Sequence, residues 1–310
     1  MFYITLVNFS LSANFLPEGA AANRAGVPAA WREVPYFSIF FPCKDCLFML
    51  LFLYYVNVIN MVGVSMVDIH CHILPDCDDG ADSMDTALLM ARMAADSGVT
   101  TIIATPHSNL PRVKEKNFRD APLALRFVEL MRQVRDAGIP LEIQPGAEVM
   151  CMPDTVELLR RRQLVTLARS DYLLVEFFFD EQPDYMDTML DAIAAEGVHP
   201  VVAHPERYEA VQQAPGIVAR WFEKGYIIQL NKGSILGRLG RGAERTAGLI
   251  LSRGLAHVVA TDAHDSLVRT SGIGSLRQLL EERCGYDYTR VLLELNPECI
   301  CRNKPVIRAN

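Results

Sequence analysis

The sequence has no excess of positive charge, because 30 Lys and Arg residues stand against 37 Asp and Glu residues and the formal net charge is −7. Proteins that bind nucleic acids by neutralising phosphates carry basic patches and a basic balance. The composition therefore argues against a nucleic-acid partner. Part of the negative charge has another interpretation, because carboxylates that bind metal cations are counted here without their cations.

Regular cysteine spacing is also missing. The 8 cysteines of the 310-residue chain follow no framework pattern, and a chain of this length does not need disulfides to hold a core together. We therefore expect reduced thiols and a cytoplasmic location.

Long apolar runs are missing as well. The run 46–56 is shorter than the roughly 20 residues that span a membrane, and it starts too late in the chain for a signal peptide. Residues 1–65 carry only three basic and three acidic residues. They are a short hydrophobic membrane anchor, a buried extra helix, or translated upstream sequence from a misassigned start. We favour the last interpretation, with Met61 or Met66 as the true start and one compact domain over 66–310.

From Met66 onward, apolar strand-like runs alternate with amphipathic helical runs. The expected strands are 67–70, 101–105, 141–143, 172–177, 200–203, 227–230 and 257–261, and the expected helices are 82–97, 118–137, 184–196, 217–224 and 244–253. A glycine directly follows each of these five helices, as expected for left-handed helix stops.

Seven β-then-α units predict an α/β fold with a parallel sheet, most simply a distorted (β/α)7 barrel. An open doubly wound sheet is the alternative. No Gly-x-Gly-x-x-Gly follows the first strand, so dinucleotide binding loses its main support.

The first strand ends in His70-Cys71-His72. Residues i and i+2 of an extended strand point to the same side, so His70 and His72 can present two imidazoles to one metal ion. Cys71 then points to the opposite face and is expected in the core.

Histidines and carboxylates recur at or just after the ends of six of the seven expected strands. These candidate metal ligands are His70, His72, Asp79, His107, Glu148, Glu176, His204, Asp262 and His264. The carboxyl ends of parallel barrel strands form one rim, which is where barrel enzymes build their active sites. Each residue alone could be a helix cap or a hydrogen-bonded core residue. Together they suit two or three ions, with Mn, Fe or Zn favoured over Ca or Mg. His199 and His257 start strands and are expected on the opposite rim.

Two arginines follow rim histidines closely, Arg207 after His204 and Arg269 after His264. Guanidinium groups bind phosphate oxygens, although a solvated surface position is the alternative for each. Several metals with two arginines point to hydrolysis of phosphate esters, in which metals activate water and arginines take up developing charge.

Two further patterns are weaker. The spacing from Cys284 to Arg290 matches the C-x5-R loop of cysteine-dependent tyrosine phosphatases, but Cys284 ends a helical run and Gly285 reads as its stop. The loop Arg238-Leu239-Gly240-Arg241 is either a solvated turn or a basic contact for an acidic or phosphorylated partner.

These motifs resemble the PHP (polymerase and histidinol phosphatase) superfamily, and more narrowly the bacterial metal-dependent protein-tyrosine phosphatases of capsule and exopolysaccharide operons. The resemblance is carried by His-x-His, Asp-Asp-Gly, Thr-Pro-His, Gly-Ala-Glu, Val-Glu-Phe, Ala-His-Pro-Glu-Arg, Asn-Lys-Gly-Ser and Thr-Asp-Ala-His, which run from Met66 to near the C-terminus.

The resemblance implies a distorted seven-stranded barrel with three divalent metal ions, usually Mn2+. The implied ligand groups are His70, His72, Glu148 and Asp262; then Glu148, Glu176 and His204; then Asp79, His107 and His264. Arg207 and Arg269 match the phosphate-binding arginines. The implied substrate is phosphotyrosine on a membrane-bound tyrosine kinase that controls polysaccharide export. A small-molecule phosphatase of the histidinol-phosphatase type and a non-catalytic metal-binding kinase adaptor are the alternatives.

Overall fold

The computed structural model describes residues 66–113 and 116–308. The segment 1–65, for which we expect a misassigned start or a hydrophobic anchor, lies outside the described residues, so that expectation stays a prediction. None of the helices in the described part of the chain is both long enough and apolar enough to cross a membrane.

Within residues 66–113 and 116–308, nine strands form two parallel sheets, ordered β1-β2-β4 and β3-β5-β6-β7-β8-β9. Their bounds are Met66–Cys71 (β1), Val99–Ala104 (β2), His107–Ser108 (β3), Glu142–Pro145 (β4), Glu148–Met150 (β5), Tyr172–Glu176 (β6), His199–Ala203 (β7), Ile227–Asn231 (β8) and Val258–Ala260 (β9). All seven strands expected from the sequence are present, and β3 and β5 are additional.

The two additional strands are the upper halves of interrupted strands. Only Thr105 and Pro106 separate β2 from β3, and only Gly146 and Ala147 separate β4 from β5. The chain stays paired across both breaks, because the Glu148 amide donates a 3.1 Å hydrogen bond to the Pro106 carbonyl. Counting each interrupted pair as one strand restores the expected seven.

The strands close into a distorted barrel. A parallel bridge joins Cys71 at the end of β1 to Ala263 beyond β9, and the His72 amide donates to the Ala263 carbonyl at 2.8 Å. The expected (β/α)7 barrel is therefore confirmed, with the bends in the second and third strands as its distortion.

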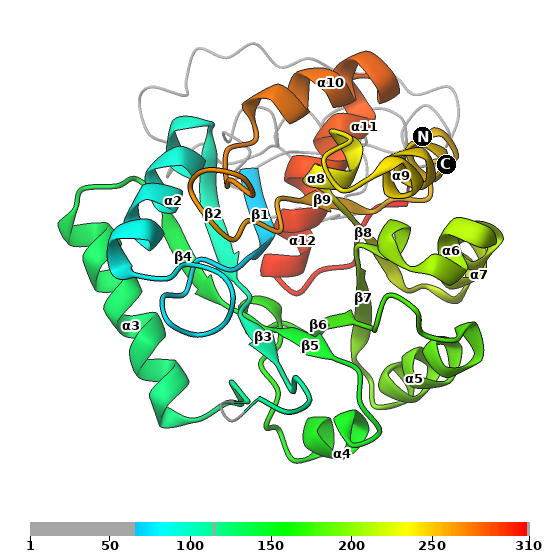
Figure 1. Ribbon diagram of the computed structural model, residues 1–310, viewed down its shortest axis with the longest axis horizontal. Helices are drawn as coiled ribbons and strands as arrows, with labels where there is room; N and C mark the ends of the chain where they lie inside the picture. Colours follow the sequence, from blue (N-terminus) through cyan, green and yellow to red (C-terminus); the bar gives the residue numbers. More distant parts are fainter. Residues whose placement is uncertain (1–65, 114–115, 309–310) are drawn as a thin grey trace, which may run out of the picture. The chain divides into compact units, whose positions relative to one another are not determined.

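Helices surround the strands on the outside of the barrel, as Figure 1 shows for α2, α3, α4, α5 and α7. The α-helix bounds are Met84–Asp96 (α2), Ala121–Asp136 (α3), Thr155–Arg160 (α4), Pro183–Ala195 (α5), Glu209–Gln213 (α6), Gly216–Lys224 (α7), Lys232–Ile235 (α8), Arg241–Ser252 (α9), Gly274–Cys284 (α10), Tyr286–Arg290 (α11) and Asn296–Cys301 (α12). The described part of the chain also contains three short helical turns: η2 (Leu167–Arg169), η3 (Pro205–Arg207) and η4 (Val291–Leu295).

Local chemistry sets several helix ends. Ser83 caps α2 by accepting a hydrogen bond from the Thr86 amide, and Asp120 caps α3 by accepting one from the Leu123 amide. Gly225 ends α7 in the left-handed region with φ of 91°. Each of these helix ends therefore lies at a residue of a type that caps or stops helices.

The apolar residues form two cores, one inside the barrel and one between strands and helices. Val67 and Ile69 of β1 belong to the inner cluster, whereas Cys71 belongs to the outer one. Residues of equal parity in a regular strand share a face, so β1 must change parity along its length. The pairing of β1 with β2 has a register irregularity between Asp68 and Cys71. Because of this irregularity, the Ile69 side chain packs in the lower part of the barrel, and the His70 and His72 side chains point to the rim above it.

Candidate metal centre

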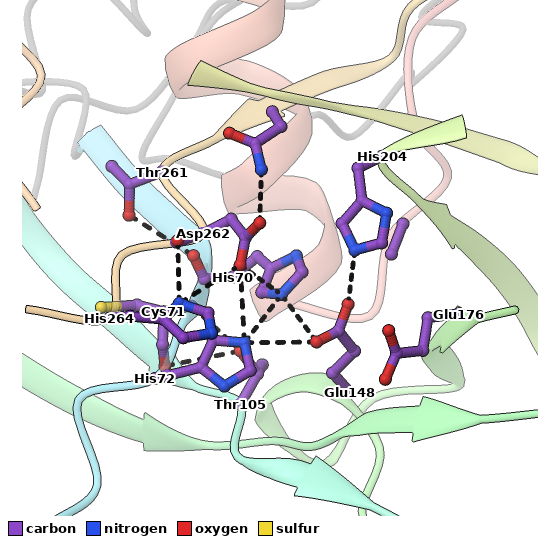
Figure 2. Close-up of polar contacts among 12 residues, drawn as sticks. His70, Cys71, His72, Thr105, Glu148, Glu176, His204, Thr261, Asp262 and His264 are labelled. Carbon is purple, nitrogen blue, oxygen red and sulfur yellow. Dashed lines mark hydrogen bonds and ion pairs between the residues drawn. The ribbon is translucent and has the colours of Figure 1, made fainter. Parts of the chain in front are cut away.

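The carboxyl ends of the strands bring the nine predicted metal ligands together. Figure 2 shows His70, His72, Glu148, Glu176, His204, Asp262 and His264 among them. They come from the end of β1 and its loop (His70, His72, Asp79), the first residues of β3 and β5 (His107, Glu148), the last residue of β6 (Glu176), the residue after β7 (His204) and the segment after β9 (Asp262, His264). All except Asp79 and His107 are buried. Their role as ligands stays a prediction, and their proximity is observed.

Four donor atoms converge on one point. The His70 Nε2 and His72 Nε2 atoms lie 3.2 Å apart, and each lies 3.2 Å from Glu148 Oε2. Asp262 Oδ1 lies 3.4 Å from His70 Nε2 and 3.6 Å from His72 Nε2. Atoms that bind one metal tetrahedrally at about 2.1 Å are about 3.4 Å apart. The spacing therefore fits a metal ion, and these are the four residues of the first implied group.

The third implied group is also assembled. Asp79 Oδ1 lies 3.4 Å from His107 Nε2 and 3.4 Å from His264 Nε2. His72 lies beside the same three residues, since its ring centroid is 3.8 Å from that of His264. The Asp79 side chain is 67% exposed, so this end of the cluster opens to solvent.

The second implied group is assembled only in part. His204 Nε2 lies 2.8 Å from Glu148 Oε1, as the dashed line in Figure 2 marks. Glu176 Oε1 lies instead 2.7 Å from His107 Nδ1, which also lies 3.1 Å from Glu148 Oε2. Glu148 thus contacts donors on both sides, which is the arrangement that a bridging carboxylate needs.

Backbone strain helps to aim two of the donors. His204 has φ of 34° and Asp262 has φ of 50°, both in the left-handed region. Non-glycine residues adopt this region at an energetic cost that the surrounding structure must offset, and such residues cluster at functional sites. Here each residue ends a barrel strand with a sharp turn that directs its side chain toward the cluster.

The buried histidines and carboxylates of the cluster shift each other's pKa values. Burial lowers the pKa of His72, but Asp78 and Glu148 together raise it to about 9. Burial acts on His107 in the same way, yet Glu148 and neighbouring carboxylates raise its pKa to about 12. Burial also opposes ionisation of Glu148, but His70 and His107 hold its pKa well below the usual value. The buried carboxylates thus require cationic partners, a requirement that bound metal ions would also satisfy.

Two observations test whether metal ions fit. His107 Nδ1 and Glu176 Oε1 are buried and 2.7 Å apart, yet neither makes a hydrogen bond of good geometry to any described residue. Atoms placed to bind an ion rather than each other explain this. In addition, the histidines and carboxylates form a donor set that suits Mn, Fe or Zn. The residues present therefore fit a metal centre.

Three supporting residues were assigned no role in the site from the sequence. Gln229 of β8 accepts a 3.0 Å hydrogen bond from His70 Nδ1, and Asp78 accepts a 2.7 Å hydrogen bond from His72 Nδ1. Each bond leaves the Nε2 atom directed at the cluster, the usual arrangement behind a metal-bound imidazole. Asn231 Nδ2 donates to Asp262 Oδ2. The sequence signal for Gln229 is that a polar residue stands inside the otherwise apolar strand 227–230.

The two predicted arginines border the cluster at Asp262. Arg269 contacts Asp262 Oδ2 at 2.7 Å and Arg207 contacts the same oxygen at 3.4 Å. The other carboxylate oxygen, Oδ1, faces His70 and His72. Asp262 therefore joins the donor cluster to a pair of guanidinium groups that are partly exposed.

Residues expected away from the site lie away from it. His199 is the exposed first residue of β7, and His257 precedes β9, where its Nδ1 accepts a hydrogen bond from the Ile228 amide. Cys284 is the last residue of α10, and Gly285 follows it with φ of 82°. Burial raises the pKa of the Cys284 thiol, the opposite of what a nucleophilic cysteine needs.

Comparisons with known proteins agree with this geometry. The chain is 34% identical over 245 residues to the tyrosine-protein phosphatase YwqE of Bacillus subtilis, which covers 78% of this chain and 94% of the relative. It is 30% identical over 243 residues to the tyrosine-protein phosphatase CpsB of Streptococcus pneumoniae, with 76% and 98% covered.

Solved structures show the same fold. One from work on YwqE and CpsB, described as unique metal-dependent tyrosine phosphatases, aligns with a TM-score of 0.74 and 34% identity over 79% of this chain and 97% of that one. A phosphotriesterase homology protein from Escherichia coli aligns with a TM-score of 0.50 and 12% identity over 76% and 97%, which bears on the fold alone. The model of a family described as "Capsular polysaccharide synthesis, CpsB/CapC" matches residues 66–302, and the chain therefore belongs to the CpsB/CapC family.

Proposed function

We propose that this chain is a metal-dependent protein-tyrosine phosphatase, which removes phosphate from phosphotyrosine in proteins. The observation that carries the proposal is the meeting of Arg207 and Arg269 on Asp262, directly beside the converging metal donors. Two guanidinium groups at that point are placed to bind the oxygens of a phosphate group. The relatives named as tyrosine-protein phosphatases support phosphotyrosine as the substrate.

We propose three bound divalent ions, with Mn2+ first and Fe or Zn as alternatives. The three ligand groups are His70, His72, Glu148 and Asp262; Glu148, Glu176 and His204; and Asp79, His107 and His264. Donor spacing supports the first and third groups. The Glu148–His204 contact supports the second.

The chemistry divides between the ions and the chain. When bound, such ions make water a better nucleophile and neutralise charge on phosphoryl oxygens. Arg207 and Arg269 hold the phosphoryl group and take up the charge that develops on it. The Asp262 carboxylate keeps both guanidinium groups beside the donors. The tyrosine hydroxyl has a pKa of about 10, so its phenolate leaves with less help from a general acid than an alkoxide needs.

The proposed substrate is the phosphorylated tail of a membrane-bound tyrosine kinase that controls capsule or exopolysaccharide synthesis, and the proposed place of action is the cytoplasm. The description of the family as one of capsular polysaccharide synthesis supports this assignment. No nucleic acid is involved in this proposal.

The test compares a phosphotyrosine peptide with histidinol phosphate, using metal-loaded protein. We expect kcat/KM for the peptide to be higher by at least about tenfold, because differential binding in the transition state sets specificity. The reverse preference would indicate a small-molecule phosphatase. Bound metal without turnover of either compound would indicate a non-catalytic adaptor.

A further inference from the structure

Helices α9 and α10 line a cavity that is separate from the metal centre and strongly basic. Its volume is about 660 Å3, and its lining residues are Arg241, Glu244, Arg245 and Arg283. Three of the four are arginines, in a chain whose net charge is −7. This concentration of positive charge runs against the overall balance of the molecule, and we call the feature the basic cavity.

The arginines of the basic cavity lack protein counter-ions. Within residues 66–113 and 116–308, neither Arg241 nor Arg245 nor Arg283 forms an ion pair, although Glu244 is one of their neighbours. Other surface arginines behave differently, since Arg132 and Arg160 each contact a carboxylate at 2.7 Å. Three unpaired guanidinium groups around one cavity repel each other and favour a bound anion.

The basic cavity lies next to the turn that carries Arg207. Helix α9 packs directly against η3. Gly242 is in the first turn of α9, and a Cβ atom there would come within 2.2 Å of Gln212 Oε1. Gln212 in turn donates a 2.9 Å hydrogen bond to the carbonyl of Glu206, the neighbour of Arg207. Helix α9, which lines the basic cavity, is therefore joined to the turn that carries Arg207 by a packing contact and, through Gln212, by a hydrogen bond.

We propose that the basic cavity binds an acidic segment of the protein substrate, a few residues away from the phosphotyrosine that enters the metal centre. This inference rests on the proposed function and adds a second contact to it. Spaced carboxylates of a peptide match three separate guanidinium groups. A nucleic acid fits less well, because its continuous phosphate charge would meet Glu244 in the cavity wall and the net negative charge of the chain.

The experiment uses metal-loaded full-length protein and three substrates: a phosphotyrosine peptide with flanking Asp and Glu residues, the same peptide with Asn and Gln in their place, and a small aryl phosphate. The test variant is the double substitution Arg241→Glu and Arg245→Glu. Arg253→Glu is the matched control, because Arg253 is the exposed C-cap of the same helix. If the double variant does not fold, the single substitution Arg245→Gln takes its place.

We expect the wild type to prefer the acidic peptide, and the double variant to lose about tenfold in kcat/KM on that peptide through a higher KM. Turnover of the neutral peptide and the aryl phosphate should change less than about twofold, as should every rate of Arg253→Glu. Arg245→Gln should lose about threefold on the acidic peptide alone. Added salt should reduce the preference of the wild type.

Equal turnover of both peptides by the wild type would overturn the inference, and so would equal losses by the double variant on all three substrates. Inhibition of wild-type peptide turnover by a short nucleic acid, absent in the variant, would replace the acidic segment with a nucleic acid. Each of these results leaves aryl phosphate turnover by the wild type intact. Failure of that turnover would count against the proposed phosphatase function instead.

Discussion

Glu148 lies between two groups of donor atoms in the metal centre. One of its oxygens lies 3.2 Å from both His70 Nε2 and His72 Nε2, and the other lies 2.8 Å from His204 Nε2. The residue is buried, and the imidazoles hold its pKa well below the usual value against the effect of burial. A carboxylate in this position is charged and shared between two groups of donors.

Substituting Glu148→Gln should remove that charge with little change in shape. We expect kcat/KM for an aryl phosphate to fall by at least about 1,000-fold, because several kcal/mol of transition-state stabilisation depend on the ions that Glu148 would hold. Metal content, measured on the same sample, should fall as well. Glu142→Gln is the control, since Glu142 lies on the same interrupted strand but is exposed. Wild-type rates for Glu148→Gln would contradict the bridging role.

Phe179 supports one of the two arginines. The guanidinium carbon of Arg207 lies 4.3 Å from the centroid of the Phe179 ring, and the Phe179 carbonyl accepts a 2.8 Å hydrogen bond from the Glu209 amide. Phe178 is exposed to a similar degree, 40% against 43% for Phe179. The pair offers a test in which only one of two adjacent rings contacts the arginine.

Phe179→Leu should weaken phosphate binding, because it removes the aromatic face beneath Arg207. We expect kcat/KM for a phosphotyrosine peptide to fall about 3- to 10-fold and the calorimetric Kd for inorganic phosphate to rise in parallel. Phe179→Tyr should restore both, and Phe178→Leu should change neither by more than about twofold. In an Arg207→Ala background Phe179→Leu should cost nothing further. An undiminished loss in that background would show that Phe179 acts independently of Arg207.

Cys284 provides a negative prediction. Its thiol is partly buried at the end of α10, burial raises its pKa, and it packs against the outer core. Cys284→Ser should therefore change kcat on an aryl phosphate by less than about twofold. A large loss without a loss of stability would bring back the cysteine mechanism that the C-x5-R spacing suggests.

Single residues were predictable where their chemistry is local. The sequence predicted that His70 and His72 share a side of β1 and that Cys71 faces the core, and the structure agrees. From the sequence, Asp79 was selected as a ligand and its neighbour Asp78 was not. The conformation of the loop decides which of the two acids contacts a histidine, and the sequence pattern does not give that conformation. Gln229 acts on a histidine 159 positions earlier, and no local pattern indicates such a partner.

Among the elements, the interrupted third strand is the one that positions the bridging carboxylate. Gly146 lies at the break between β4 and β5, and a Cβ atom there would come within 2.6 Å of Ile103 Cγ2 and 3.1 Å of Thr105 Cγ2. The neighbouring second strand thus approaches too closely for any side chain. This close approach occurs two residues before Glu148, the first residue of β5.

Gly146→Ala should therefore destabilise the fold by about 1–3 kcal/mol, as expected for overpacking, and lower activity beyond the effect on stability. Gly248→Ala is the matched control. Gly248 lies inside α9, and nothing lies within 4 Å of the position that an added methyl group would take, so the change should stabilise by about 0.5–1 kcal/mol. Denaturant unfolding measures both. A neutral Gly146→Ala would show that the strands can separate there without cost.

Elements with a clear period were predicted, and short ones were not. The seven expected strands and the helix stops at Gly225 and Gly285 are present. β3 and β5 were missed because strands of two and three residues carry no alternation to detect. Pro106 and Gly146 mark the breaks, but a proline or glycine in a sequence indicates a turn as readily as an interrupted strand.

At the scale of the whole molecule, the barrel gathers residues that lie almost 200 positions apart into one buried cluster. Strand alternation and the parallel-sheet rule were enough to predict that these nine residues meet at one rim, and their role as ligands stays a prediction. Which donors contact each other was harder to predict from the sequence, because side-chain torsions decide whether His107 points to Glu176 or to Asp79. The structure shows it between them, with Nδ1 beside one and Nε2 beside the other.

Part of the acidic balance of the chain lies in the same cluster. Glu148, Glu176 and Asp262 are buried carboxylates close to one another, and such groups are costly unless cations accompany them. Bound divalent ions should therefore stabilise the folded protein as well as activate it, by about 2.7 kcal/mol when their concentration is 100 times Kd.

The most direct test of the central claim is the release of phosphate from a phosphotyrosine peptide by one wild-type sample before chelation, after chelation, and after Mn2+ is restored, with metal content measured at each stage. The donor geometry and the arginine pair predict that activity disappears with the metal and returns with it. Full activity in a sample shown to contain no metal would contradict the account.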